Sequence, residues 1–247
     1  RQGTTFKQTL PAEARLLPFV FSDDEVAIFA LSNNRLDVYS SAGAVIQSNY
    51  TTNCNWTTAQ LFELNFAQFG DTIFVAHRNN PLRKIFRVSA SSFTVTAFTF
   101  ATHSTGYPIY EPYYKYADSA TTIATSATTG SVTVTASAAT FSAAWVGIKI
   151  RKDDKTMTIT AFTDTTHVTA TVNETLANTT ATADWDEQAI STLRGYAQAV
   201  TFHAKRLWLG GLYSRPAAVL ASKISEYYNF DVDDADSADA IDVDISG

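Results

Sequence analysis

The stretch AVTFHAKRLWLGGLYSRP, residues 199–216, decides the fold. Apolar residues alternate with polar ones on both sides of a short polar turn, which is the pattern of two neighbouring β-strands. One face of this hairpin is expected to be buried, and it consists of Val200, Phe202, Leu207 and Leu209. Trp208 then falls on the opposite face, where it can pack against a neighbouring element.

The basic residues of this stretch raise the question of a binding site. We place His203, Lys205 and Arg206 at the turn between the strands, which favours a scaffold role over a ligand site. Gly210-Gly211 is expected to let the chain leave the second strand, and Arg215-Pro216 to fix the next corner. Replacing Gly211 with Val is therefore expected to impair folding.

Two other stretches share this order of residues, and they begin at Phe19 and Asn65. Each of the three has a Phe, a short polar turn, an alternating apolar strand and then an Arg. The Phe residues are Phe21, Phe66 and Phe202; the strands contain 26–28, 73–75 and 207–209; the Arg residues are Arg35, Arg78 and Arg215. Phe21 and Phe66 are 45 positions apart, which is close to the 40–50 residues of a four-stranded propeller blade. The repeat predicts part of a β-propeller.

The composition of the chain limits the classes of function that it can have. The chain has 247 residues, of which 45% are hydrophobic and 13% aromatic, enough to build a core. The net charge of −6 argues against a general nucleic-acid-binding surface. Cys54 is the only cysteine, so no internal disulfide can form and a reducing compartment is expected. The start at Arg1 and the end within a strand-like pattern favour a piece of a longer polypeptide, or its ordered part.

The middle of the chain differs from its flanks. Residues 119–148 contain no charge, but Ser and Thr alternate with apolar residues there, so we predict no membrane span. We expect an all-β fold: propeller-like blades in 1–118, a small Thr/Ala-rich β-barrel or sandwich inserted in one loop at 119–191, and a continued blade in 192–247. The expected core of the insert is Trp145, Ile148, Ile150, Ile159, Phe162 and Val168.

No motif for catalysis or cofactor binding is present. The sequence lacks a phosphate-binding loop, a dinucleotide fingerprint, a zinc-binding helix signature and a nucleophile elbow. The four His residues are scattered, so we predict no catalytic residue, no cofactor and no metal site. Seven Asp residues in 230–244 leave a Ca²⁺ loop open, although a solvated acidic loop is favoured because the EF-hand Gly and terminal Glu are missing.

A Tyr-rich run, YPIYEPYYKY, stands at residues 107–116 within an expected linker. Tyr offers a large contact area at low entropy cost, which favours a subunit interface over a stacking platform for sugar or single-stranded nucleic acid. The predicted interface residues are Tyr107, Tyr110, Tyr113, Tyr114 and Tyr116.

Three phrases carry a family resemblance. LLPFVFSDDEVAIFAL, ELNFAQFGDTIFVAHRNNPLRKIFRV and RGYAQAVTFHAKRLWLGGLYSRPAAVLASKISEYYNF resemble segments of tail tubular protein B, the tail nozzle protein of short-tailed phages. Related packaged-DNA stabilisation hub proteins share this pattern, and the insert resembles a small β-domain found in many such proteins. Ala197-Gln198 stands where the family usually has Pro-Arg. The signature residues are Phe202, Arg206, Leu207, Gly210, Gly211, Pro216 and Phe230.

The resemblance implies a non-enzymatic virion protein, made in the host bacterial cytoplasm. Six copies would form a ring that binds the tail adaptor protein and the tail fibres, holds the end of the phage double-stranded DNA and later conducts it. An acidic wall suits a conduit, because it repels phosphates. The alternative is a carbohydrate-binding or depolymerising β-propeller protein of a phage tail, which requires clustered aromatics and a carboxylate pair in one pocket.

Overall fold

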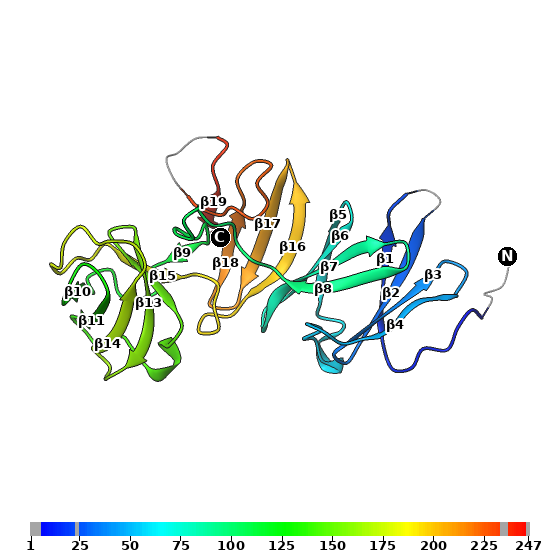
Figure 1. The fold of residues 1–247 in the computed structure, drawn as a ribbon, viewed down its shortest axis with the longest axis horizontal. Helices are drawn as coiled ribbons and strands as arrows, with labels where there is room; N and C mark the ends of the chain where they lie inside the picture. The colour runs from blue at the N-terminus through cyan, green and yellow to red at the C-terminus, as the bar shows by residue number, and fades with distance from the viewer. Residues whose placement is uncertain (1–5, 23–24, 233–236, 246–247) are drawn as a thin grey trace. The chain divides into compact units, whose positions relative to one another are not determined.

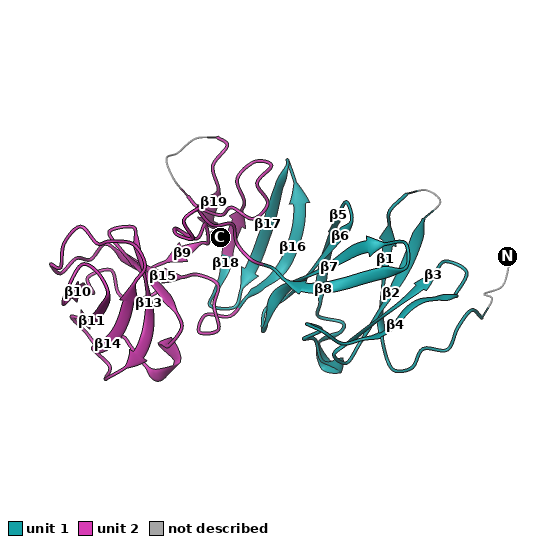
Figure 2. Ribbon diagram, in the orientation of Figure 1, with its two compact units in different colours: residues 1–98, 196–217 teal, residues 99–195, 218–247 magenta. Residues whose placement is uncertain are grey.

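The computed structural model describes residues 6–22, 25–232 and 237–245. These residues form β-strands, two short 3₁₀ turns and loops, so the expected all-β class is confirmed (Figure 1). The chain divides into two compact units, Arg1–Phe98 with Tyr196–Ala217 and Thr99–Gly195 with Ala218–Gly247 (Figure 2). No helix within the described ranges has the length and apolar character to cross a bilayer.

The first sheet of unit 1 is a four-stranded antiparallel meander. Its strands in order are β1 (Arg15–Val20), β2 (Val26–Ser32), β3 (Arg35–Ser40) and β4 (Val45–Tyr50). β2 and β3 form a hairpin, and its turn places Asn34 at a φ of +51°. Asn accepts this left-handed conformation because its short polar side chain bonds locally.

The second sheet repeats the same order. It contains β5 (Asn65–Phe69), β6 (Thr72–His77), β7 (Asn80–Ser89) and β8 (Ser92–Ala97). Gly70 closes the hairpin between β5 and β6 with a φ of +53°. Before this sheet lies the 3₁₀ turn η1 (Thr58–Gln60), where the Thr57 N–H donates to Oε1 of Gln60 at 3.0 Å.

The alternating residues of these two sheets build one core. Phe19 of β1 stacks on Phe29 of β2 at 5.2 Å, and both meet Phe93 of β8 edge-on. Trp56 lies fully buried beside them and donates its Nε1–H to the Ser32 carbonyl at 2.9 Å. Trp is buried most readily when its N–H has such a partner.

The third sheet contains the opening stretch, and its order is β16 (Ala197–His203), β17 (Arg206–Leu212), β18 (Arg215–Ala221) and β19 (Ile241–Asp244). The boundary between the units lies within β18, after Ala217. Val200 pairs with Leu209 and Phe202 with Leu207, which confirms the predicted shared face. All three four-stranded sheets are meanders, as the repeat predicts for this part of the chain.

Two details of the opening stretch differ from the prediction. Gly210 and Gly211 do not end the strand, because β17 continues through them to Leu212. The corner lies one turn later, at Tyr213 and Ser214, and Arg215-Pro216 begins β18. Pro216 has no N–H to donate. It is tolerated in β18 because β19 pairs with β18 only from Ala218 onwards, so no hydrogen bond to β19 is lost at Pro216.

Unit 2 contains a seven-stranded antiparallel sheet. Its strands are β9 (Tyr113–Tyr114), β10 (Ile123–Thr125), β11 (Ser131–Ala136), β12 (Lys149–Lys152), β13 (Lys155–Phe162), β14 (His167–Val172) and β15 (Trp185–Gln188), in the order β10-β11-β14-β13-β12-β15-β9. The second 3₁₀ turn, η2 (Ala143–Trp145), lies between β11 and β12. The sheet is not closed into the barrel that we considered; an isolated bridge between Ile123 and Thr182 ties its first strand to the loop before β15.

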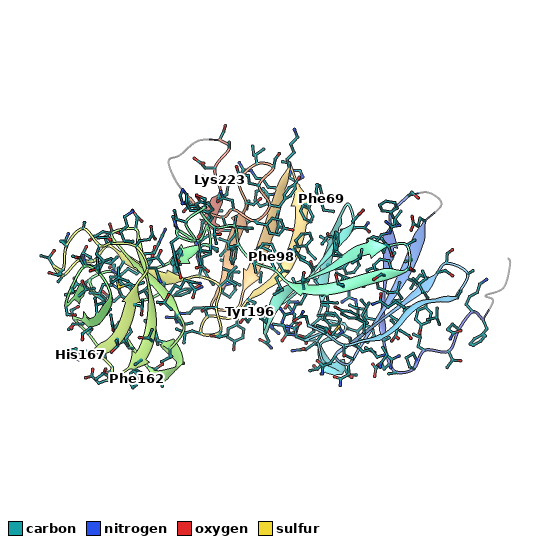
Figure 3. All side chains as sticks on the ribbon, viewed as in Figure 1. Phe69, Phe98, Phe162, His167, Tyr196 and Lys223 are labelled. Carbon is teal, nitrogen blue, oxygen red and sulfur yellow. The ribbon has the colours of Figure 1, made fainter. Side chains whose placement is uncertain are left out.

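The core of this sheet matches the prediction at every expected position except Phe162. Trp145, Ile150 and Val168 are buried, as are Ile148 and Ile159. Phe162 is 37% exposed, although a bulge after Ile159 brings it opposite the buried Val168. The reason is its position as the last residue of β13, where the sheet no longer covers it (Figure 3).

Candidate functional site

The signature residues occupy scaffold positions. Leu207 and Phe230 are buried, and Phe202 stacks on Phe69 at 5.0 Å. Arg206 is 5% exposed, Gly210 and Gly211 lie within β17, and Pro216 is exposed. Gly211 has a φ of +62°, which favours glycine, and a Cβ built there would lie 3.2 Å from Cβ of Gln198, a close contact.

The Tyr-rich run is not a free linker. Tyr113 and Tyr114 form β9, the edge strand of the seven-stranded sheet, and pair with Gln188 and Glu187 of β15. Tyr113 is only 9% exposed, and both its ring and its hydroxyl contact residues of its own unit. Its contacts are thus within unit 2, and a subunit contact at Tyr113 stays a prediction. Tyr107, Tyr110, Tyr114 and Tyr116 are partly buried, and for them an interface stays a prediction.

A buried polar network surrounds β9. The carboxylate of Glu111 accepts hydrogen bonds from the Tyr113 hydroxyl at 3.0 Å and the Gln188 amide at 2.7 Å, and Nζ of Lys149 lies 3.1 Å away. Burial raises the pKa of Tyr113 far above its ordinary value, and the Glu111 carboxylate adds to this rise. The hydroxyl thus stays protonated and acts as a fixed donor.

Two arginine–carboxylate pairs flank the network. Arg151 of β12 donates from Nε and an Nη to Asp186 at 3.0 and 2.6 Å, and its guanidinium lies 4.2 Å from the ring centre of Tyr113. Arg194 makes the same two-bond contact with Glu187. Burial raises the pKa of both carboxyls, and the arginines counter that rise. Such forked pairs hold both side chains in one geometry.

A cavity of about 530 Å³ opens beside Arg151 in unit 2. Its charged lining residues are Arg151, Asp154, Lys155, Glu174 and Asp231, and its other lining residues are Pro108, Ile109, Tyr113, Thr156 and Val232. Its volume lies in the range of about 300–1,000 Å³ that is typical of small-molecule sites. This cavity is the strongest candidate for a ligand site in unit 2.

The histidines do not gather into a site. His77 is buried and contacts Glu63 at 3.0 Å, whereas His167 contacts Asp164 at 3.0 Å in a turn of the seven-stranded sheet (Figure 3). His103 and His203 are exposed. Within the described part of the chain, no three His, Cys, Asp or Glu side chains are placed to hold a metal ion. Burial raises the pKa of the Cys54 thiol to about 12, which makes it a poor nucleophile.

The acidic segment 230–244 is described only in part. Asp233, Asp234 and Asp236 lie outside the described residues. Asp239 pairs with Lys223 at 3.3 Å, and Asp242 and Asp244 belong to β19. The Ca²⁺ alternative for this segment therefore stays untested.

Sequence reasoning missed the network around β9 and the cavity. A weak signal was present, because charged residues return at Lys149, Arg151, Lys152 and Asp154 directly after thirty uncharged positions. Nothing local, however, links these residues to Glu111 or Glu187. In comparisons with known proteins, the chain matches no protein-family model and no curated protein.

Proposed function

We propose that this chain belongs to a nozzle or hub ring protein in the tail of a short-tailed phage, where it holds the genome and later conducts it. The proposal rests on one arrangement of strands, the four-stranded meander, which occurs three times in the chain. Each four-stranded meander has a buried second strand followed by an Arg at or just before its third strand, and the quoted phrases of the family resemblance fall on these meanders.

The charge balance supports a conduit rather than a DNA clamp. With 24 acidic and 18 basic side chains, the protein carries a net charge of −6. A wall of this sign repels phosphates, so DNA would slide along it instead of being held by many ion pairs. Transient contact with double-stranded DNA, and binding to an adaptor ring and to tail fibres, belong to this proposal.

Electron microscopy of the purified full-length protein, alone and with its adaptor, tests the proposal. We expect six-fold rings that seat on the adaptor ring. Particles that remain monomeric at micromolar concentration, both alone and with the adaptor, would contradict it. So would rings whose lumen is lined mainly by Lys and Arg, because such a wall would retain DNA.

The second candidate is a carbohydrate-binding or depolymerising tail protein. One observation favours it: the cavity of unit 2 places Tyr113 beside three carboxylates, those of Asp154, Glu174 and Asp231. Release of reducing sugar from capsular polysaccharides of candidate host bacteria, lost on Glu174→Gln, would support hydrolysis. We expect no release, because a ring protein needs no such reaction.

A further inference from the structure

We propose that the 530 Å³ cavity of unit 2 binds a neutral saccharide. The cavity is formed by the turn between β12 and β13, by Glu174 after β14, and by the segments at Ile109 and Asp231. This inference does not depend on the proposed conduit function; it rests on the second candidate function and specifies its ligand class at this cavity.

The lining offers both kinds of hydrogen-bonding partner. Asp154 and Glu174 provide carboxylate acceptors, whereas Arg151 and Lys155 provide donors. A sugar hydroxyl donates one hydrogen bond and accepts others, so it satisfies both kinds of group at once. The apolar residues Ile109 and Val232 can cover the C–H face of a sugar ring.

The charges argue against a phosphate or another polyanion. Two cationic and three anionic side chains line the cavity. The guanidinium of Arg151 is already paired with Asp186, and Nζ of Lys155 lies 4.0 Å from Glu174. The lining therefore carries more negative than positive charge, which disfavours a phosphate, whereas hydrogen bonding to an uncharged hydroxyl needs no further charge.

A peptide strand would not fit the polar wall beside Arg151. β12 pairs with β13 on one side and with β15 on the other, so it offers no open edge for another strand. A ligand beside β12 is therefore recognised by side chains, as a saccharide is.

The site is already ordered in the absence of ligand. Arg151 is held by its two bonds to Asp186 and by the Tyr113 ring, and Glu174 accepts the Thr156 N–H at 3.2 Å. Preorganised side chains cost less entropy on binding.

Asp154 lines the cavity with an exposed side chain. It has a φ of +61°, which Asp accepts in a two-residue hairpin turn; its carboxylate has no hydrogen bond or ion pair in the described part of the chain, although its charge acts on Arg151. Its neighbour Asp153 also has a positive φ, but that carboxylate binds the buried Lys152 at 2.8 Å. An unpaired carboxylate in the lining of a cavity is suited to a ligand hydroxyl.

Calorimetry and saturation-transfer NMR on the whole chain test the site, with maltose, cellobiose, lactose and chitobiose as probes. We expect one or more of them to bind at millimolar concentration. Asp154→Asn and Glu174→Gln should each weaken binding about tenfold, the loss expected for one charge-assisted hydrogen bond. Both replacements keep the shape of the side chain, and Asn also tolerates the left-handed backbone.

Asp184→Asn is the matched control, because Asp184 is an exposed carboxylate of the same unit that does not line the cavity. It should leave the affinity unchanged. The proposal is overturned if none of the four sugars binds, or if the two cavity variants bind as the parent protein does. Ring formation is measured separately, so failure here leaves the nozzle proposal standing.

Discussion

Arg194 grips Glu187 with two parallel hydrogen bonds, from Nε to Oε2 at 2.8 Å and from an Nη to Oε1 at 2.6 Å. The Glu187 side chain is fully buried, whereas that of Arg194 is 24% exposed. The guanidinium also lies 4.4 Å from the ring centre of Tyr116. The pair therefore fastens the segment after β15 to the sheet.

Replacing Arg194 with Ala should destabilise the protein by about 3–5 kcal/mol, because it leaves a buried carboxylate without its partner. Burial already raises the pKa of Glu187 from 4.5, and loss of the arginine should raise it further. The destabilisation should thus be largest near neutral pH, shrink as the pH falls through the raised folded-state pKa of Glu187, and be nearly gone at pH 4.5, where the carboxyl is largely protonated in the folded state of both proteins. Urea unfolding at both pH values measures this.

Lys155→Ala serves as the comparison. Its ammonium is half exposed and 4.0 Å from Glu174, so its removal should change stability by less than about 1 kcal/mol. If Arg194→Ala is no more damaging than Lys155→Ala, the Arg194–Glu187 pair does not stabilise the fold.

Asp164 should titrate well below an ordinary aspartate. Its carboxylate accepts hydrogen bonds from the backbone N–H of Thr166 at 2.8 Å, from the His167 ring and from the Thr166 hydroxyl, and these lower its pKa from 3.8 to about 2. A lowered folded-state pKa means that Asp164 stabilises the fold above pH 3.8 and that this contribution disappears as the pH falls through about 2. Carbon-detected NMR of the side-chain carboxyl measures the midpoint.

The variant His167→Ala separates the effect of the His167 ring on the pKa of Asp164 from the effect of the Thr166 N–H. It removes the ring but keeps the Thr166 N–H, so the midpoint should rise yet stay below 3.8. A parent midpoint near the ordinary value would show that this turn does not hold the carboxylate as described.

The hairpins could be predicted from the sequence because their causes are local. Asn34 and Gly70 supply the positive φ that a tight turn needs, and period-2 alternation marks the strands beside them. The buried network around β9 could not be predicted, because its members are far apart in the sequence: Glu111 precedes Lys149 by 38 positions and Gln188 by 77. Such pairs depend on strand order, which alternation does not encode.

The cavity could not be predicted from the sequence for the same reason. Lys155 and Glu174 lie on opposite sides of a hairpin, and Asp231 is more than fifty positions further on. The Tyr-rich run was expected to be a linker because its two Pro residues and the preceding Gly106 indicate a loop, whereas Tyr113 and Tyr114 pair with β15 as an edge strand. Tertiary pairing outweighed local preference at that position.

Gly211→Ala should cost more stability than Gly70→Ala. Both glycines have a positive φ, so each replacement carries a left-handed penalty of about 1–2 kcal/mol. Gly70 has open space around its Cα, whereas a Cβ at Gly211 would meet Cβ of Gln198 at 3.2 Å. The difference between the two variants in urea unfolding measures this crowding, and equal losses would mean that Gln198 moves aside without cost.

The turn between β16 and β17 offers a way to stabilise the protein. Ala204 and Lys205 both have positive φ, at +48° and +59°, although neither residue type favours it. Asn-Gly is the preferred pair for a two-residue hairpin of this kind. The double change Ala204→Asn/Lys205→Gly should therefore raise the free energy of unfolding by about 1 kcal/mol, measured as a higher urea midpoint. The same pair at Tyr213 and Ser214, where neither residue has a positive φ, should give no gain and a small loss from the flexibility of Gly. An equal gain at both turns would show that the left-handed backbone is not what limits the stability of the first.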